Sequence, residues 1–111
     1  MIPTTEAQTL RAILDYLTFK GVLFIRLNPT KPFTDRRTGA LRFAPVRQGQ
    51  AGAPDIVLCQ NGRFVGLEVK SDKGRLSPSQ AEWQSRVERA GGTYHVIRSV
   101  DQVIQILDNA S

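Results

Sequence analysis

Apolar side chains recur every three or four residues near the N-terminus of the chain. This spacing predicts a first helix from about Thr5 to Phe19, because residues three and four apart share one helix face. Thr5 and Gln8 have the pattern of a capping box at its start, and Gly21 is typical of a helix end. The apolar positions that form the predicted buried stripe are Leu10, Ile13, Leu14 and Leu17.

The next segment changes from an apolar run to a basic stretch with little periodicity. Residues 22–27 are β-rich, which predicts a strand that ends before Asn28-Pro29. Residues 28–53 contain several glycines and prolines and are predicted to form a long basic loop, with 41–43 as a short extended piece. The basic residues of this loop include Lys31, Arg36, Arg37, Arg42 and Arg47.

A hairpin is predicted after this loop. Two β-rich runs, from Asp55 to Cys59 and from Arg63 to Lys70, flank the dipeptide Asn61-Gly62. This dipeptide favours a tight type I′ turn, because both residues tolerate positive φ. The two strands are therefore expected to pair antiparallel.

Two helices and a strand complete the pattern. The segment Ser77-Pro78-Ser79-Gln80 predicts a second helix, because it combines a serine cap, an early proline and a capping-box glutamine, and Gly91-Gly92 ends this helix. Residues 93–97 are predicted as a strand, and Ser99 with Gln102 begins a last helix. The second helix is predicted to turn Trp83, Val87 and Ala90 inward and Glu82, Ser85, Arg86 and Arg89 outward.

This order of elements predicts an α/β fold with a mixed central sheet flanked by helices. The 111 residues are enough for one domain, residues 1–111, and too few for a second core. Fifteen Lys and Arg against ten Asp and Glu give a net charge of +5, and the pI is near 10.0. This balance favours a polyanionic partner such as nucleic acid.

The cysteine count and the apolar runs argue against an internal disulfide, a structural zinc site and a membrane span. Cys59 cannot form an internal disulfide and lies in an apolar strand, so it is predicted to pack in the core. One His and one Cys exclude a structural zinc site. Neither a signal sequence nor a bilayer-length apolar run is present, so a cytoplasmic protein with no membrane partner is expected.

The candidate chemistry lies in the predicted hairpin. Asp55 opens one strand and Glu68 lies on its neighbour, so the two carboxylates can converge on one divalent cation. Lys70 lies two residues after Glu68 and projects to the same side, because side chains on a strand alternate between faces. This group suits phosphodiester hydrolysis, since Mg²⁺ typically takes one or two carboxylates together with substrate phosphate oxygens.

Each of these residues also has an ordinary structural explanation. Asp55 follows a proline, as aspartates in turns often do, and Glu68 with Lys70 could form an exposed strand pair. The remaining positions of the two strands are rich in Val, Ile, Leu and Phe, however. Two acids and one lysine on the same face of such strands favour a site over coincidence.

Two further polar residues are candidates for the same site. Glu6 shares a helix face with Leu10 and is predicted to belong to the buried stripe, although a glutamate in a first turn also interacts favourably with the helix dipole. Gln80 is turned toward the sheet by its spacing to Trp83, where its amide could bind a phosphate oxygen or a water molecule near the ion. Alternatively, Gln80 only caps the backbone at Ser77.

The motifs described above resemble those of one nuclease family. The run Gly52-Ala53-Pro54-Asp55, the Glu68-x-Lys70 motif and the helix opening Ser77 to Trp83 are similar to the VRR nucleases, the virus-type replication-repair nuclease domain of the restriction-endonuclease-like superfamily. The first helix with Glu6 belongs to the same resemblance. The pattern from Asp55 to Trp83 is fairly specific, whereas an isolated Asp…Glu-x-Lys is common by chance.

The resemblance implies a restriction-endonuclease-like fold and a DNA nuclease that depends on Mg²⁺ or Mn²⁺. Small stand-alone relatives resemble phage or bacterial proteins that dimerise and cut branched DNA as Holliday junction resolvases do. A homodimer that acts on four-way junctions is therefore expected. The positions that match the active site of the family are Glu6, Asp55, Glu68, Lys70 and Gln80.

This hypothesis assigns a role to each residue. Asp55, Glu68 and the carbonyl of Val69 bind the metal, Lys70 orients or activates the attacking water, and Glu6 and Gln80 position water molecules around the ion. The residues expected to contact DNA phosphates, or alternatively only to keep the protein soluble, are Arg36, Arg37, Arg42, Arg47, Lys73 and Arg75. The other functions that the sequence allows are a sequence-specific or flap-type nuclease and a non-catalytic DNA-binding module.

Overall fold

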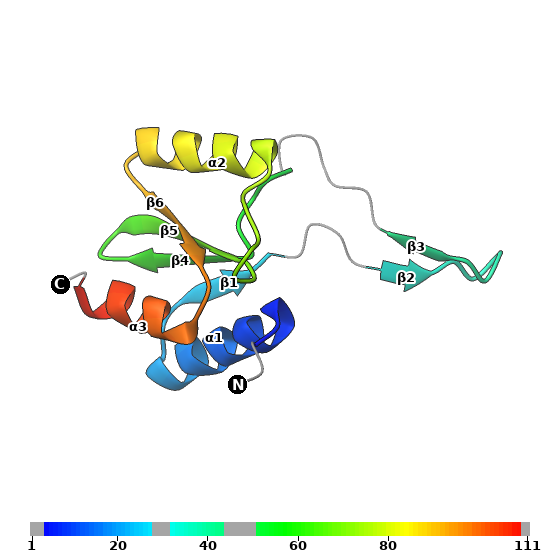
Figure 1. The fold of residues 1–111 in the computed structure, drawn as a ribbon, viewed down its shortest axis with the longest axis horizontal. Coiled ribbons are helices and arrows are strands. Elements are labelled where there is room, and N and C mark those ends of the chain that lie inside the picture. The colour runs from blue at the N-terminus through cyan, green and yellow to red at the C-terminus, as the bar shows by residue number, and fades with distance from the viewer. Residues whose placement is uncertain (1–3, 28–31, 44–50, 110–111) are drawn as a thin grey trace.

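The computed structural model describes residues 4–27, 32–43 and 51–109 of the chain (Figure 1). These residues form three helices and six strands. In chain order they are α1 (Glu6–Lys20), β1 (Phe24–Arg26), β2 (Pro32–Thr34), β3 (Leu41–Phe43), β4 (Ile56–Gln60), β5 (Arg63–Val69), α2 (Pro78–Arg89), β6 (Thr93–Ile97) and α3 (Val100–Asn109).

Four of the strands form the central sheet in the order β1-β4-β5-β6. Strand β4 pairs antiparallel with β1 and β5, whereas β5 pairs parallel with β6, so the sheet is mixed. Helix α2 lies over one face of the sheet, and α1 and α3 lie over the other (Figure 1). The predicted α/β fold, a mixed sheet flanked by helices, is confirmed.

The helix ends follow the capping patterns in the sequence. In α1, the Thr5 side chain accepts a hydrogen bond from the Gln8 backbone N–H at 3.1 Å, and the Gln8 side chain accepts from the Thr5 backbone N–H at 2.9 Å. The helix ends at Gly21, whose φ of 70° is the left-handed conformation that glycine adopts at little cost. These contacts fix the length of the helix that covers the lower face of the sheet in Figure 1.

The turn between β4 and β5 has the geometry that its sequence predicts. Asn61 and Gly62 both have positive φ, at 53° and 77°, as a type I′ turn requires. The turn sets the register of the two strands, which pair Gln60 with Arg63 and Ile56 with Leu67. The position of every side chain on β5 relative to β4 follows from this register.

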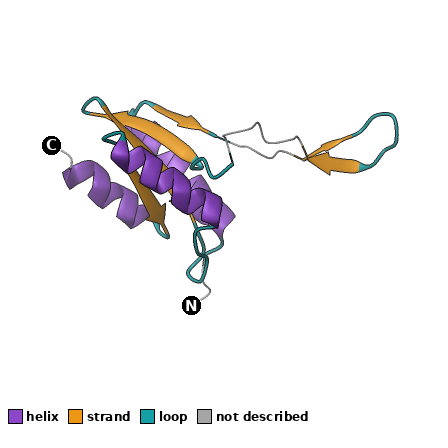
Figure 2. Ribbon diagram, turned by 90° about the horizontal axis from the view of Figure 1, so that it is seen from above, coloured by secondary structure: helices purple, strands orange, loops and turns teal. Residues whose placement is uncertain are grey.

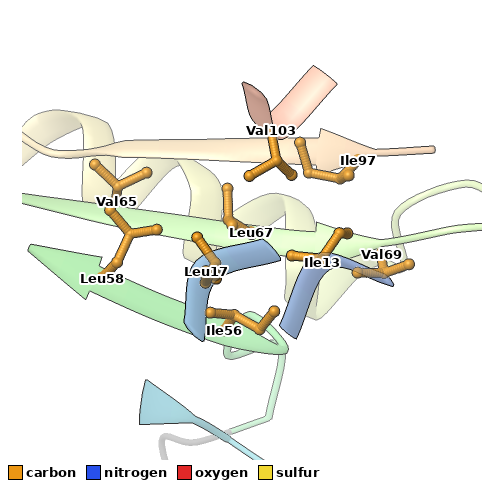
Figure 3. Close-up of a cluster of buried hydrophobic side chains, with 9 residues drawn as sticks. All are labelled: Ile13, Leu17, Ile56, Leu58, Val65, Leu67, Val69, Ile97 and Val103. Carbon is orange, nitrogen blue, oxygen red and sulfur yellow. The ribbon is translucent and has the colours of Figure 1, made fainter. Parts of the chain in front are cut away.

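The hydrophobic core lies between the sheet and the pair α1 and α3 (Figure 3). Alternate residues of β4 and β5 point into it, because successive side chains of a strand point to opposite faces. The intervening side chains of β4 and β5 point to the opposite face of the sheet, toward α2. The buried core residues are Ile13, Leu17, Ile56, Leu58, Val65, Leu67, Val69, Ile97 and Val103.

The prediction of a long loop over residues 28–53 is wrong for residues 32–34, whereas the short extended piece predicted at 41–43 is confirmed as β3. Residues 32–43 form an antiparallel hairpin of β2 and β3, which stands away from the four-stranded sheet in both views (Figures 1 and 2). Its turn is held by Asp35, whose backbone N–H donates to the Ala40 carbonyl at 2.9 Å and whose carboxylate accepts from the Arg37 N–H at 2.9 Å. The two strands have three residues each, too few to show a period of two in the sequence.

Two predictions of buried side chains are also wrong. Cys59 is exposed, because β4 turns Ile56 and Leu58 into the core and leaves Cys59 on the opposite face at the end of the strand. Ala90 is exposed because it is the C-cap of α2, whose buried contact is Val87. Among the described residues, no helix is long and apolar enough to span a membrane.

Candidate active site

Asp55 lies immediately before β4, and its side chain is hydrogen-bonded to the backbone at the end of β5. Its Oδ2 atom accepts a hydrogen bond from the Val69 backbone N–H at 2.8 Å. Ile56 pairs with Leu67, so the same register continued by one residue places Asp55 opposite Glu68. Residues that face each other across an antiparallel pair carry their side chains on the same face of the sheet. The hairpin therefore brings the two predicted carboxylates together.

Glu68 is a buried carboxylate on the face of the sheet toward α2. Only 5% of the residue is exposed, whereas its neighbours Leu67 and Val69 point to the opposite face and belong to the core. Its Oε2 atom lies 3.9 Å from the Nζ atom of Lys70, so these two residues share a side of the sheet as predicted. Its Oε1 atom lies 3.4 Å from the Tyr94 hydroxyl.

The surroundings of Glu68 disfavour its negative charge. Burial in the protein, followed by the charge of Asp55, raises the pKa of Glu68 from 4.5 to about 8. The Lys70 ammonium and the Tyr94 hydroxyl act in the opposite direction without cancelling this rise. Glu68 therefore keeps its proton at neutral pH in the metal-free protein.

The segment that leads into Asp55 lies against the start of α2. Gly52 has a φ of 92°, and a Cβ atom at this position would lie 2.2 Å from the Ser79 carbonyl oxygen. Only glycine allows this contact, since a larger residue would be strained in conformation and would also collide with the helix backbone. Gly66 allows a second close approach, because a Cβ atom there would lie 2.9 Å from Cγ of Pro54.

Gln80 takes part in the cap of α2. Its side-chain oxygen accepts from the Ser77 backbone N–H at 2.9 Å, while the Ser77 hydroxyl accepts from the Gln80 N–H at 3.3 Å. The predicted capping contact between Gln80 and Ser77 is confirmed. A role of its amide toward a metal or phosphate stays a prediction.

The predicted burial of Glu6 is wrong. Glu6 is exposed in the first turn of α1, and the buried residues of that helix are Thr9, Ile13 and Leu17. The reason is that this first turn precedes the part of α1 that packs on the sheet. Within the described ranges, no three Asp, Glu, His or Cys side chains are grouped so that they could hold one metal ion, so Glu6 is not gathered with Asp55 and Glu68.

The predicted DNA-contacting residues lie in two separate regions. Arg36 and Arg37 are exposed in the turn of the β2–β3 hairpin, and Lys73 and Arg75 are exposed between β5 and α2. The structure describes only the backbone of Arg42, on β3. Arg47 lies outside the described residues.

Two side chains near the site, those of Arg98 and Tyr94, are not predicted from the sequence, and no contact is predicted for Gly52 although it belongs to the motif that ends at Asp55. The Arg98 guanidinium donates to the carbonyls of Ser71 and of Gly74, the latter at 2.9 Å, and so holds the turn that follows Lys70. Tyr94 donates toward Glu68, and Gly52 allows the contact with α2. No sequence signal identifies Arg98 or Tyr94, because their partners are more than twenty residues away in the chain.

Comparison with known families agrees with this geometry. A family model for the VRR-NUC domain matches residues 30–101, which is more than half of the chain. The chain belongs to the VRR-NUC family. The resemblance noted in the sequence is therefore confirmed, and the chain is a nuclease-family domain with DNA as the implied partner. VRR-NUC nucleases are generally dependent on a divalent metal.

Solved structures support the same VRR-NUC fold. One structure described as a VRR_NUC domain has a TM-score of 0.66 and 19% sequence identity, and the match covers 97% of this chain and 100% of the other. Another, described as a VRR_NUC domain protein, has a TM-score of 0.63 and 16% identity, with 98% of this chain and 89% of the other covered. No curated protein matches this chain.

Proposed function

We propose that this chain is a divalent-metal-dependent endonuclease that cuts branched DNA, with four-way junctions as its substrate and a homodimer as its active form. The observation that carries the proposal is the pair of half-buried Asp55 and buried Glu68 with Lys70 beside it. Two carboxylates that face each other across paired strands, with one ammonium nearby, are a common arrangement for phosphodiester hydrolysis.

The donor set fits a divalent cation. Asp55 and Glu68 supply hard oxygen ligands, and burial, followed by the charge of Asp55, raises the pKa of Glu68, so a nearby positive charge would favour the ionised pair. These two side chains would hold the ion, with the Val69 carbonyl as a further ligand. When bound, the ion supplies Lewis-acid polarisation of the phosphodiester and the missing positive charge.

Lys70 and Gln80 would act on the substrate. The Lys70 side chain is 16% exposed, so its ammonium can reach a phosphate group that enters the site. There it would orient the attacking water and offset the negative charge that develops on the phosphoryl oxygens. The side-chain oxygen of Gln80 is engaged by Ser77, which leaves the amide nitrogen to donate to water or to a phosphate oxygen.

Size and charge support the junction substrate and the dimer. Resolution of a four-way junction needs two incisions, and a single domain of 111 residues with one such site requires a second copy to make both. The net charge of +5 favours DNA through release of counterions. Exposed Arg36 and Arg37 on the hairpin, with Lys73 and Arg75 beside the site, would contact phosphates and thereby select DNA shape over base sequence.

The test compares a labelled four-way junction, a flap and a linear duplex, each with and without Mn²⁺ or Mg²⁺. We expect paired incisions in the junction that depend on the metal. Asp55→Ala should bind the junction without cutting it. The control Asp15→Ala, on the exposed face of α1, should cut normally. Equal digestion of all three substrates would contradict structure selectivity. Binding without cleavage under either metal would indicate a non-catalytic DNA-binding module.

A further inference from the structure

Tyr94 connects the two segments that carry the site carboxylates. It lies on β6, is 3% exposed and pairs in register with Gly66, while Glu68 pairs with Val96 two residues further along. Because side chains alternate along a strand, Tyr94 and Glu68 lie on the same face of the sheet. A tyrosine with its polar end buried normally needs a hydrogen-bond partner.

The Tyr94 hydroxyl has two acceptors within reach of its single proton. It lies 3.2 Å from the carbonyl oxygen of Gly52 and 3.4 Å from Oε1 of Glu68, so its proton is shared between them. Gly52 precedes Asp55 by three residues, so one hydroxyl contacts the segment of each carboxylate. The backbone of Tyr94 is fixed as well, because the Gln84 side-chain amide of α2 donates to its carbonyl at 3.2 Å.

The chemistry of this hydroxyl suits a donor to a carboxylate. A tyrosine hydroxyl is protonated at neutral pH and can donate its proton to a carboxylate oxygen. Once a cation is bound and Glu68 is ionised, a hydrogen bond donated to its carboxylate is about twice as strong as a bond between neutral groups. A phenylalanine ring has nearly the same shape, so Tyr94→Phe removes this donor and little else.

We propose that Tyr94 is a positioning residue, which holds the Glu68 carboxylate and the turn at Gly52 in the arrangement in which Asp55 and Glu68 bind one divalent cation. This inference rests on the proposed function. Tyr94 acts through Glu68 and does not contact the substrate. Partners that orient a metal-binding side chain typically contribute about 10- to 100-fold to metal affinity.

The test is Tyr94→Phe in the full chain, with Mn²⁺ binding measured by calorimetric titration and thermal unfolding recorded in parallel. We expect Mn²⁺ to bind about 10-fold more weakly, and the Mn²⁺ concentration for half-maximal cleavage to rise in proportion, with cleavage recovered at saturating Mn²⁺. The matched control is Tyr16→Phe, which removes a hydroxyl from a half-buried tyrosine of α1. Tyr16→Phe should bind Mn²⁺ as the unmodified protein does.

Several outcomes would overturn this role. Unchanged Mn²⁺ affinity in Tyr94→Phe, with or without a lower melting temperature, would leave Tyr94 a structural residue only. A second comparison uses the Glu68→Gln background, where Tyr94→Phe should weaken the residual Mn²⁺ binding by less than it does in the unmodified protein, and an equal loss in both backgrounds would contradict action through Glu68. If the unmodified protein bound no Mn²⁺, the proposed function would fail first, so the two failures are distinguishable.

Discussion

Glu68→Gln should stabilise the metal-free protein at neutral pH, although it removes a residue that the proposed function needs. Glutamine has nearly the same shape as protonated glutamate and carries no charge to bury. The pKa of Glu68 is about 8 in the folded protein, compared with an ordinary value of 4.5. At pH 7 the carboxyl of residue 68 is ionised in the unfolded chain and protonated in the folded protein. The free energy of unfolding is therefore about 3 kcal/mol lower than at pH 4.5, at 1.36 kcal/mol for each pH unit between them.

The sign of the pH dependence follows from the raised pKa. Below pH 4.5 the carboxyl is protonated in both states, so its stabilising contribution is complete. As the pH rises toward 8, the unfolded chain loses the proton first, and the free energy of unfolding falls by about 1.4 kcal/mol per pH unit. Above pH 8 both states are ionised and the fall from this group levels off. Glu68→Gln removes this slope.

The assay is urea unfolding in the presence of a chelator between pH 5 and pH 9, for the unmodified protein, Glu68→Gln and the control Glu82→Gln. Glu82 lies on the exposed face of α2, so its variant should retain the slope of the unmodified protein. Addition of Mn²⁺ should then stabilise the unmodified protein by more than it stabilises Glu68→Gln. Equal slopes for all three proteins, or a less stable Glu68→Gln at pH 7, would refute the reasoning.

Three further changes test other parts of the structure. Gly52→Ala should lower the free energy of unfolding by about 2 kcal/mol or more in urea, because its Cβ atom would collide with Ser79 and its φ is positive. The pair Arg36→Ala and Arg37→Ala should weaken junction binding and reduce the slope of log affinity against log salt by about one for each phosphate that is no longer neutralised. Cys59→Ser should change stability by less than about 0.5 kcal/mol, and native Cys59 should react with a thiol reagent, since it is exposed.

Local chemistry explains which parts of this fold were predictable from sequence. The cap at Thr5, the turn at Asn61-Gly62 and the alternation through Glu68 and Lys70 depend on neighbours within a few residues. These features also set the register that places Asp55 opposite Glu68. The main part of the candidate site could therefore be predicted once the hairpin had been identified.

The remaining features depend on how distant elements pack. Tyr94 contacts Glu68 because β6 pairs parallel with β5. The sequences of the two strands do not indicate that they are neighbours. The burial of Glu6 was inferred from helical spacing, which gives the direction of a side chain but not how far the sheet extends beneath the helix. The predicted burial of Cys59 is wrong for a similar reason. An apolar strand has two faces, and at Cys59 the core packs against the other one.

The charges at the site show why Lys70 does not take the place of a metal ion. The ammonium lies 3.9 Å from Glu68 and lowers the pKa of that carboxyl, but burial and the charge of Asp55 still hold this pKa at about 8. At pH 7 the metal-free protein therefore keeps a proton on Glu68, and the formal charges of Asp55 and Lys70 cancel. Under the proposed function, a divalent cation would displace this proton, and the two carboxylates, the ammonium and the cation would sum to one positive charge, which attracts an anionic phosphodiester. Burial of Glu68 thus opposes its ionisation in the metal-free protein and, for the same reason, strengthens the attraction of the ionised pair for a divalent cation.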